Sequence, residues 1–239
     1  MRDYPDLPVL QPNEALQSIS ASVLSRAQKL LAASLVTQSR SFVHTLKDIG
    51  EDLLILDVTH FLNHRINTRL IDAIGEELAE KVAMFSPDLI LTAPSSGNIP
   101  AIATASHLPN QPDIIYAPKG TPITMTQVYR ASSRSYTHGK SVDLTVARDC
   151  LPADTRVAVC DDFLDTGRTG MDLTDIITQA KAVVAVFFFV IEKPFGGRDS
   201  LKAAGFADEQ IISLIQIDSM RPGKLKLAGF DSWFQLTRS

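Results

Sequence analysis

The stretch VAVCDDFLDTGRTG, residues 157–170, joins an apolar strand pattern to an acidic pair and a glycine-rich turn. Its first four residues lead directly into Asp161 and Asp162, where a buried charge without a partner is costly in free energy. The turn 166–170 then opens a helical pattern. Backbone N–H groups at a helix N-terminus, reached through glycines, are typical of a phosphate site. Taken alone, the turn also fits a plain helix start, but its position after the strand and the acidic pair favours phosphate binding.

Segments with strand-like and helix-like apolar patterns alternate along the rest of the chain. Strands are predicted at 53–58, 88–93, 113–118, 141–148, 155–162, 182–192 and 210–217, and helices at 68–85, 99–108 and 169–181. This alternation predicts an α/β fold with a mostly parallel sheet flanked by helices on both faces. Ligands bind beyond the carboxyl ends of such strands. We therefore expect three turns to converge there, namely SSGN (95–98), DDFLDTGRTG (161–170) and EKPFGG (192–197).

Two segments depart from this alternation. Residues 13–38 carry apolar side chains at helical spacing and predict one amphipathic helix with Asn13 as its cap. Residues 1–45 are then a helical extension that precedes a main domain at 46–239. The extension either packs on its own core or clasps a second copy of the chain. Residues 119–140 are rich in Thr, Ser and Arg and lack a helical stripe, which predicts a β-hairpin or a mobile flap.

Composition and charge limit the kinds of partner. The 239 residues carry a net charge of −4 and no Lys/Arg-rich block, so the charge favours neither a nucleic-acid nor a membrane-surface partner. The longest apolar run, residues 182–191, is about half of the ~20 residues that span a bilayer. The N-terminus is too polar for a signal peptide. Cys150 and Cys160 are too few for a disulfide framework, and the histidines lack metal-ligand spacing. We expect a cytoplasmic protein.

Residues 157–170 resemble the signature of the type I phosphoribosyltransferases, in which a hydrophobic strand and two acidic residues precede the loop for the 5′-phosphate of phosphoribosyl pyrophosphate. Further segments, in order from about residue 50 to residue 217, are similar to the bacterial xanthine phosphoribosyltransferase subgroup: LDVTHFLNHRI (56–66), SSGNIPAIATA (95–105), IIYAPKG (114–120) and FVIEKPFGGRDSLKAAGF (189–206). The resemblance implies a type I phosphoribosyltransferase fold and the transfer of 5-phosphoribose from phosphoribosyl pyrophosphate to a 6-oxopurine, xanthine first. It also implies a homodimer that requires Mg²⁺.

The resemblance assigns the phosphoribosyl pyrophosphate site residue by residue. The acidic pair Asp161 and Asp162 matches the residues that bind the ribose 2′ and 3′ hydroxyls. The substrate would hold Mg²⁺ for the main part, and these two carboxylates would be its contacts on the protein. The other matches are the 5′-phosphate loop (Asp165, Thr166, Gly167, Arg168, Thr169), the pyrophosphate turn (Ser95, Ser96, Gly97) and a basic position near the pyrophosphate (Lys119). At Gly97 we expect a positive φ and a close approach of the backbone. Asp161, Asp162 and Asp165 are the residues implied in catalysis.

Three residues match positions at the nucleobase: Leu56, Asn63 and Lys193. A lysine suits a carbonyl oxygen and not the 6-amino group of adenine, so a buried Lys193 favours oxopurines. Asp165 also resembles the position proposed as general base in hypoxanthine-guanine enzymes, and its role stays open between support of the phosphate loop and proton transfer. Residues 123–140 are the expected lid, with candidate anion contacts at Tyr129, Arg130, Arg134, Tyr136 and Lys140.

Two further functions remain as alternatives. The first is specificity for adenine or for hypoxanthine and guanine. Pro118 stands where the xanthine subgroup commonly has an arginine, and Ala93–Pro94 stands in place of an acidic residue, so the match at the pyrophosphate is incomplete. The second is a non-catalytic regulator that binds phosphoribosyl pyrophosphate. Such regulators carry a DNA-binding winged helix before the domain, whereas residues 1–45 supply one predicted helix and little positive charge.

Overall fold

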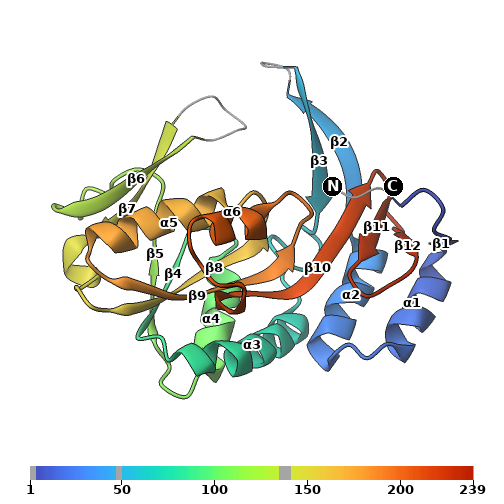
Figure 1. Ribbon diagram of the computed structural model, residues 1–239, viewed down its shortest axis with the longest axis horizontal. Coiled ribbons are helices and arrows are strands. Elements are labelled where there is room, and N and C mark those ends of the chain that lie inside the picture. The colour runs from blue at the N-terminus through green and yellow to red at the C-terminus, as the bar shows by residue number, and fades with distance from the viewer. Residues whose placement is uncertain (1–3, 47–49, 135–140, 239) are drawn as a thin grey trace.

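The computed structural model describes residues 4–46, 50–134 and 141–238 and is built around one eight-stranded sheet (Figure 1). In spatial order its strands are β1 (Val9–Leu10), β12 (Trp233–Gln235), β11 (Lys224–Leu227), β10 (Ile211–Arg221), β9 (Val183–Glu192), β8 (Arg156–Leu164), β4 (Leu89–Thr92) and β5 (Asp113–Tyr116). Neighbouring strands are parallel, except that β11 is antiparallel to both β10 and β12. The predicted α/β fold with a mostly parallel sheet is confirmed.

Helices cover both faces of the sheet, as the unbroken apolar runs of its central strands require. Successive side chains of β9 point to opposite faces: Phe188 and Val190 join one buried cluster, and Phe187 and Phe189 join the other. The first cluster receives α1 (Pro12–Ala21), α2 (Arg26–Gln38), α3 (Thr68–Val82) and α4 (Asn98–His107), and the second receives α5 (Arg168–Gln179) and α6 (Gly197–Ala203). In Figure 1, α3 and α4 accordingly lie below the sheet, and α5 and α6 above it.

The single helix predicted at 13–38 is wrong, because the chain breaks there into α1 and α2. The Ser22 hydroxyl donates to the Ile19 carbonyl oxygen at 2.6 Å and closes α1. Ser25 and Gln28 form a reciprocal capping box that opens α2. Val23, which continues the apolar stripe, is fully exposed in the break. Serine therefore ends and restarts the helix although the apolar spacing continues through it.

Helix α1 also begins earlier than predicted. It starts at Pro12, and Gln11 takes the capping position, with its N–H donating to Oε2 of Glu14 at 2.8 Å. The expectation that Asn13 caps this helix is therefore wrong. Proline at the first helical position fits, because its missing N–H would have no acceptor there.

The N-terminal segment is joined to the rest of the molecule by packing and by strand pairing. Leu31 and Leu35 of α2 are fully buried in the same cluster as Phe188. Strand β1 extends the sheet along β12, and the Trp233 indole N–H donates to the Tyr4 carbonyl oxygen at 2.9 Å. A boundary at residue 45 would cut through a strand, β2 (Arg40–Leu46), which the sequence did not predict.

Two hairpins rise from the same side of the sheet (Figure 1). One pairs β2 with β3 (Glu51–Asp57), and the other pairs β6 (Val128–Arg134) with β7 (Ser141–Ala147). The second confirms a hairpin in the segment expected to be the flap, with its return strand at the predicted position. Tyr136 and Lys140, two of the candidate anion contacts, lie outside the described residues.

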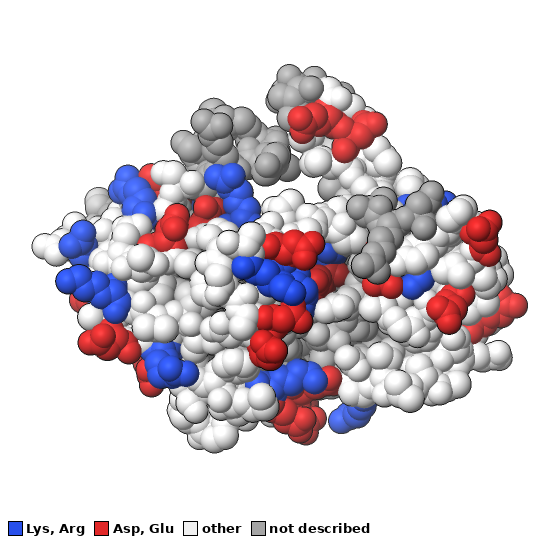
Figure 2. Space-filling model, viewed as in Figure 1, with Lys and Arg blue, Asp and Glu red and all other residues white. Residues whose placement is uncertain are grey.

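The surface carries charges of both signs. Figure 2 shows lysine and arginine intermixed with aspartate and glutamate over the face drawn there, which agrees with a sequence that lacks a basic block. Within the described ranges, none of the helices has the length and apolarity that a membrane span requires.

Candidate active site

Strand β8 carries the acidic pair beyond the end of its neighbour β4. The two strands pair up to Thr92 opposite Cys160, where β4 ends, whereas β8 continues to Leu164 along β9. Asp161 and Asp162 therefore lie within the last part of the strand rather than after it. They stand at the carboxyl edge of the sheet, where the fold class places its ligands.

The two carboxylates have different partners. Oδ1 of Asp161 accepts the backbone N–H of Asp162 at 2.9 Å, and Oδ2 of Asp162 accepts the side-chain amide of Asn63 at 3.3 Å. Burial, and then the negative charge of Asp162, raise the pKa of Asp161 well above its usual value, although the Asp162 N–H and the positive charge of Lys193 oppose the rise. Hydroxyl donors or a cation at this position would stabilise the ionised form of the pair.

The glycine-rich turn forms a small hollow at the start of α5. Gly167 adopts the left-handed conformation with φ of 83°, and the helix begins at Arg168. The first N–H groups of a helix have no acceptor within it. The residues at this helix start belong to the lining of a cavity of about 200 Å³, formed by Asp161, Phe163, Leu164, Asp165, Thr166, Gly167, Arg168, Thr169, Gly170 and Phe189. Free donors, the helix dipole and a concave shape together suit an oxyanion.

The turn after β4 approaches the acidic pair through a glycine. A Cβ atom at Gly97 would lie 2.9 Å from the Ala93 carbonyl oxygen and 3.0 Å from Oδ1 of Asp161, and it would collide with the Thr92 hydroxyl. The expected close approach is therefore present. The expected positive φ is wrong, because Gly97 has φ of −62° and leads directly into α4. Glycine is required here for space and not for its backbone angles. The Pro94–Ser95 peptide bond before it is cis.

The turn after β9 brings a lysine to the same edge. Nζ of Lys193 lies 3.4 Å from Oδ2 of Asp165 and 4.2 Å from the centre of the Phe163 ring. The Lys193 side chain is only 12% exposed. A cation over the face of an aromatic ring is attracted by the negative charge density of that face. The structure thus joins Lys193, expected at the nucleobase, to Asp165, expected in the phosphate loop.

Glycines also hold the turns after β8 and β9 in contact. A Cβ atom at Gly167 would lie 2.9 Å from the Gly197 carbonyl oxygen, and one at Gly197 would lie 2.5 Å from the Asp165 carbonyl oxygen. Together with the contact between Gly97 and Asp161, these approaches confirm the predicted convergence of three turns at one edge of the sheet.

The remaining predicted site residues lie in different surroundings. Leu56 is buried in the core cluster of α3 and α4, whereas Asn63 reaches the site through its bond to Asp162. Lys119 is exposed, on the segment that follows β5. Ser95 and Ser96 lie between β4 and Gly97, on the same turn.

Sequence reasoning missed two features of the site. The Phe163 ring under Lys193 had a sequence signal, since it lies between the acidic pair and Asp165 in the stretch that points to the ligand. The other is Arg198, whose guanidinium donates to both carboxylate oxygens of Glu192, with the shortest distance 2.7 Å. This ion pair ties α6 to the strand end that carries Lys193, and the spacing of Glu192 and Arg198 matches neither the helical nor the strand period.

Sequence comparison finds relatives of this chain among the xanthine phosphoribosyltransferases. The chain is 41% identical over 181 residues to a xanthine phosphoribosyltransferase of Chloroflexus aurantiacus, which covers 74% of this chain and 82% of that relative. It is 36% identical over 175 residues to a xanthine phosphoribosyltransferase of Geobacillus thermodenitrificans, which covers 72% of this chain and 87% of that relative. No family model matches the chain.

Solved structures with the same fold include two adenine phosphoribosyltransferases. The protein from Rhodothermus marinus has a TM-score of 0.61 at 19% identity and covers 80% of this chain and 98% of its own. The protein from Trypanosoma brucei, solved with AMP, pyrophosphate and ribose-5-phosphate, has a TM-score of 0.62 at 15% identity and covers 82% of this chain and 81% of its own. At these identities the likeness concerns the fold alone. The sequence relatives identify the family and the solved structures agree with its fold: this chain belongs to the xanthine phosphoribosyltransferase family, within the type I phosphoribosyltransferases.

Proposed function

We propose that the protein transfers 5-phosphoribose from phosphoribosyl pyrophosphate to a 6-oxopurine, with xanthine as the preferred base, and releases pyrophosphate. One observation carries the proposal: the phosphate-type turn, the acidic pair and a largely buried lysine meet at one edge of the sheet. Relatives at 36–41% identity named xanthine phosphoribosyltransferase support this choice of base.

The sugar phosphate would lie across the end of β8. The N–H groups at the start of α5 and the Thr166 and Thr169 hydroxyls bind the 5′-phosphate, with Gly167 giving the room that the turn needs. Asp161 and Asp162 accept hydrogen bonds from the ribose 2′ and 3′ hydroxyls. Ser95, Ser96 and Gly97 bind the pyrophosphate on the other side of the acidic pair, and Lys119 contributes charge.

Mg²⁺ fits this site as an ion held mainly by the substrate. Among the described residues, no group of three or more His, Cys, Asp or Glu side chains is placed to hold a metal by itself. The adjacent carboxylates of Asp161 and Asp162 provide the one or two protein ligands that Mg²⁺ commonly takes beside substrate phosphates. When bound, the ion would neutralise charge on the leaving pyrophosphate.

The nucleobase would lie on the Lys193 side of the ribose. The ammonium of Lys193 would donate to the 6-oxo group, and its partner Asp165 would accept a proton from the purine ring. Asn63 orients Asp162 through the amide hydrogen bond. Leu56, buried in the core, shapes the base pocket through the backbone of β3.

In the transfer itself, the bond between ribose C1 and the pyrophosphate oxygen breaks, and its electron pair leaves with pyrophosphate. A bond forms between C1 and N9 of the purine, and the ring loses one proton. Preorganised N–H donors and cations stabilise the negative charge that develops on the leaving group. The protein therefore contributes position and charge rather than a covalent intermediate. We place this reaction in the cytoplasm and in a homodimer.

The decisive experiment measures pyrophosphate release from phosphoribosyl pyrophosphate and Mg²⁺ with xanthine, guanine, hypoxanthine, adenine and uracil offered separately. Turnover fastest with xanthine supports the proposal, and preference for adenine or for hypoxanthine and guanine transfers it to the corresponding alternative. Donor binding without turnover of any base would support a regulator instead. The matched variants Asp165→Asn, at the site, and Asp175→Asn, exposed on α5, separate an effect of the site from an effect of charge.

A further inference from the structure

The segment that carries Lys119 continues from the edge of the sheet toward the β6–β7 hairpin. After β5 ends at Tyr116, the Ala117 N–H donates to the Thr92 carbonyl oxygen at 2.8 Å. This bond keeps the chain beside the residue that opens the pyrophosphate turn. Lys119 follows two residues later with an exposed side chain, so its position depends on what holds its backbone.

Strand β7 holds that backbone on both sides of the lysine. The Thr145 N–H donates to the Pro118 carbonyl oxygen at 3.2 Å, and the Gly120 N–H donates to the Asp143 carbonyl oxygen at 2.7 Å. Lys119 itself forms an isolated antiparallel bridge with Leu144. The segment is thus attached to the outer edge of β7 through a single bridge and the two hydrogen bonds that flank it.

A side chain completes this attachment. The hydroxyl of Thr145 donates to the Gly120 carbonyl oxygen at 2.6 Å, and Thr145 has no exposed surface. Because Thr145 bonds to Pro118 through its backbone and to Gly120 through its hydroxyl, one buried residue contacts both neighbours of Lys119. The buried hydroxyl of Thr145 thus adds a second hydrogen bond between β7 and this segment, and one such bond typically contributes about 0.5–1.5 kcal/mol.

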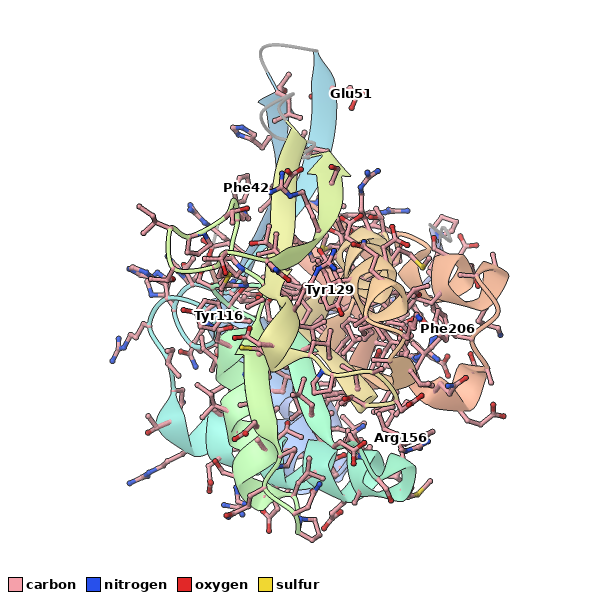
Figure 3. The ribbon with its side chains drawn as sticks, turned by 90° about the vertical axis from the view of Figure 1, so that its left-hand side faces the viewer. Phe42, Glu51, Tyr116, Tyr129, Arg156 and Phe206 are labelled. Atoms are coloured by element: carbon pink, nitrogen blue, oxygen red, sulfur yellow. The ribbon has the colours of Figure 1, made fainter. Side chains whose placement is uncertain are left out.

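The hairpin is fixed in turn to the helix that begins at the 5′-phosphate turn. The side-chain amide of Gln179, at the end of α5, accepts the Arg130 N–H at 3.2 Å and donates to the Arg130 carbonyl oxygen at 2.7 Å. The Arg130 guanidinium donates to Asp143 at 3.1 Å and to the Thr121 hydroxyl at 3.0 Å. Figure 3 shows Tyr129 at the base of this hairpin, beside α5. A continuous path of hydrogen bonds therefore joins α5 to the segment of Lys119.

We propose that Thr145 is a positioning residue that sets Lys119 against the pyrophosphate of the donor. The inference rests on the proposed function, in which Lys119 contributes charge at the pyrophosphate. A flexible lysine loses less entropy on binding when its backbone is already fixed. Thr145 touches no substrate in this arrangement, and its side chain acts through the Gly120 carbonyl oxygen.

The test compares Thr145→Val, which removes the hydroxyl at nearly equal volume, with Thr145→Ser, which keeps it. Equilibrium binding of phosphoribosyl pyrophosphate with Mg²⁺, together with KM for donor and base, is measured in wild type, both variants and Lys119→Met. We expect Thr145→Val to weaken donor binding by about 2- to 10-fold, the range of one hydrogen bond, with KM for the base unchanged. Thr145→Ser should bind as wild type does. Ser132→Ala, which removes a bond to Asp143 farther along the hairpin, is the matched control for general loosening.

The double variant Thr145→Val with Lys119→Met separates positioning from stability. If Thr145 acts through Lys119, its change has no further effect once the lysine charge is gone. Two results would overturn the inference and leave the role of Lys119 intact. In the first, Thr145→Val weakens donor binding equally with and without Lys119. In the second, Thr145→Val binds the donor as wild type does, whereas Lys119→Met binds it more weakly. A Lys119→Met variant with wild-type donor affinity would overturn the proposed pyrophosphate role of Lys119, and with it the inference. An inactive wild-type protein that does not bind the donor would contradict the proposed function itself.

Discussion

Nζ of Lys193 lies 3.4 Å from Oδ2 of Asp165 and directly over the ring of Phe163. The two charged groups come from different turns, after β9 and in the loop after β8. The Lys193 side chain is 12% exposed and that of Asp165 is 49% exposed, so the ion pair lies at the border between the protein interior and solvent. The pair therefore connects the turn proposed to recognise the base with the loop proposed to hold the sugar phosphate.

Lys193→Met keeps the length of the side chain and its contact with Phe163 but removes the charge. We expect kcat/KM for xanthine to fall by about 10- to 100-fold, the size of a lost hydrogen bond to a charged group, with donor affinity close to wild type. Initial rates with xanthine at varied base and donor concentrations measure both effects. Lys202→Met, at a more exposed lysine of α6, is the control. An equal loss in the two variants would contradict a role of Lys193 at the base.

Gly97→Ala tests the close approach of the pyrophosphate turn to the acidic pair. The added methyl would meet Thr92 and the Ala93 carbonyl oxygen, so the turn has to move away from Asp161. We expect a loss of about 1–3 kcal/mol in the free energy of unfolding and a large loss of donor binding.

Gly75→Ala is the matched control for Gly97→Ala, because its methyl would lie 2.7 Å from the backbone of Ala103, between α3 and α4 and away from the site. It should cost similar stability and leave donor affinity unchanged. Urea unfolding and donor titration of both variants provide the comparison. Unaltered donor binding in a folded Gly97→Ala protein would disprove the role given to this turn.

The main architecture and the convergence of the turns could be predicted because they depend on local signals. Unbroken apolar runs identified β8 and β9, and the rule that ligands gather at the carboxyl ends of parallel strands placed Asp161, Gly167 and Lys193 together. Predicting that these three residues lie at one edge of the sheet required no knowledge of their individual contacts.

What the sequence could not predict depends on distant neighbours or on competing local bonds. The apolar stripe of α1 and α2 continues in phase through Val23, and only the hydroxyls of Ser22 and Ser25 decide that the helix breaks there. A glycine in the turn 95–98 fits either a positive φ or a close approach, and only the position of Thr92 and Asp161 distinguishes them. Strand β2 forms because β3 lies opposite, and its own sequence carries a weak pattern.

Ser25→Ala tests the helical break before α2. The Ser25 hydroxyl accepts the Gln28 N–H at 3.1 Å and also bonds to the Glu77 carboxylate of α3. Loss of this cap should lower the free energy of unfolding by about 1 kcal/mol and leave turnover unchanged. Ser106→Ala, at an exposed hydroxyl that bonds within α4, is expected to have a much smaller effect. Equal stabilities of the two variants in urea would argue against the cap.

Asp57 gives a prediction for acid stability. Burial alone would raise its pKa, but hydrogen bonds from the side chain and backbone of Thr59 and from Arg40 lower it to about 2. Because the folded pKa lies below the unfolded one, this carboxylate stabilises the fold above about pH 4, and the contribution is lost as the pH falls toward 2. The stability difference between wild type and Asp57→Asn should therefore shrink over that window in chemical unfolding. A difference that stays constant from pH 7 to pH 2 would contradict the assignment.

For Asp161 we expect the opposite dependence of folding stability on pH. Burial and the charge of Asp162 raise its folded pKa above the unfolded value, so between these two values the folded protein binds more protons than the unfolded chain. Stability from this residue is present below the unfolded pKa and falls as the pH rises through that window.

Asp161→Asn keeps an oxygen that can accept the Asp162 N–H and removes the buried charge. We expect the variant to be more stable than wild type at neutral pH and to lose most donor binding, because a neutral amide no longer attracts a cation or two hydroxyl donors. Unfolding in urea at pH 4 and pH 7, with donor titration at pH 7, tests both parts. A variant that is less stable than wild type at neutral pH would contradict the electrostatic argument, since it would mean that the ionised carboxylate stabilises the empty protein.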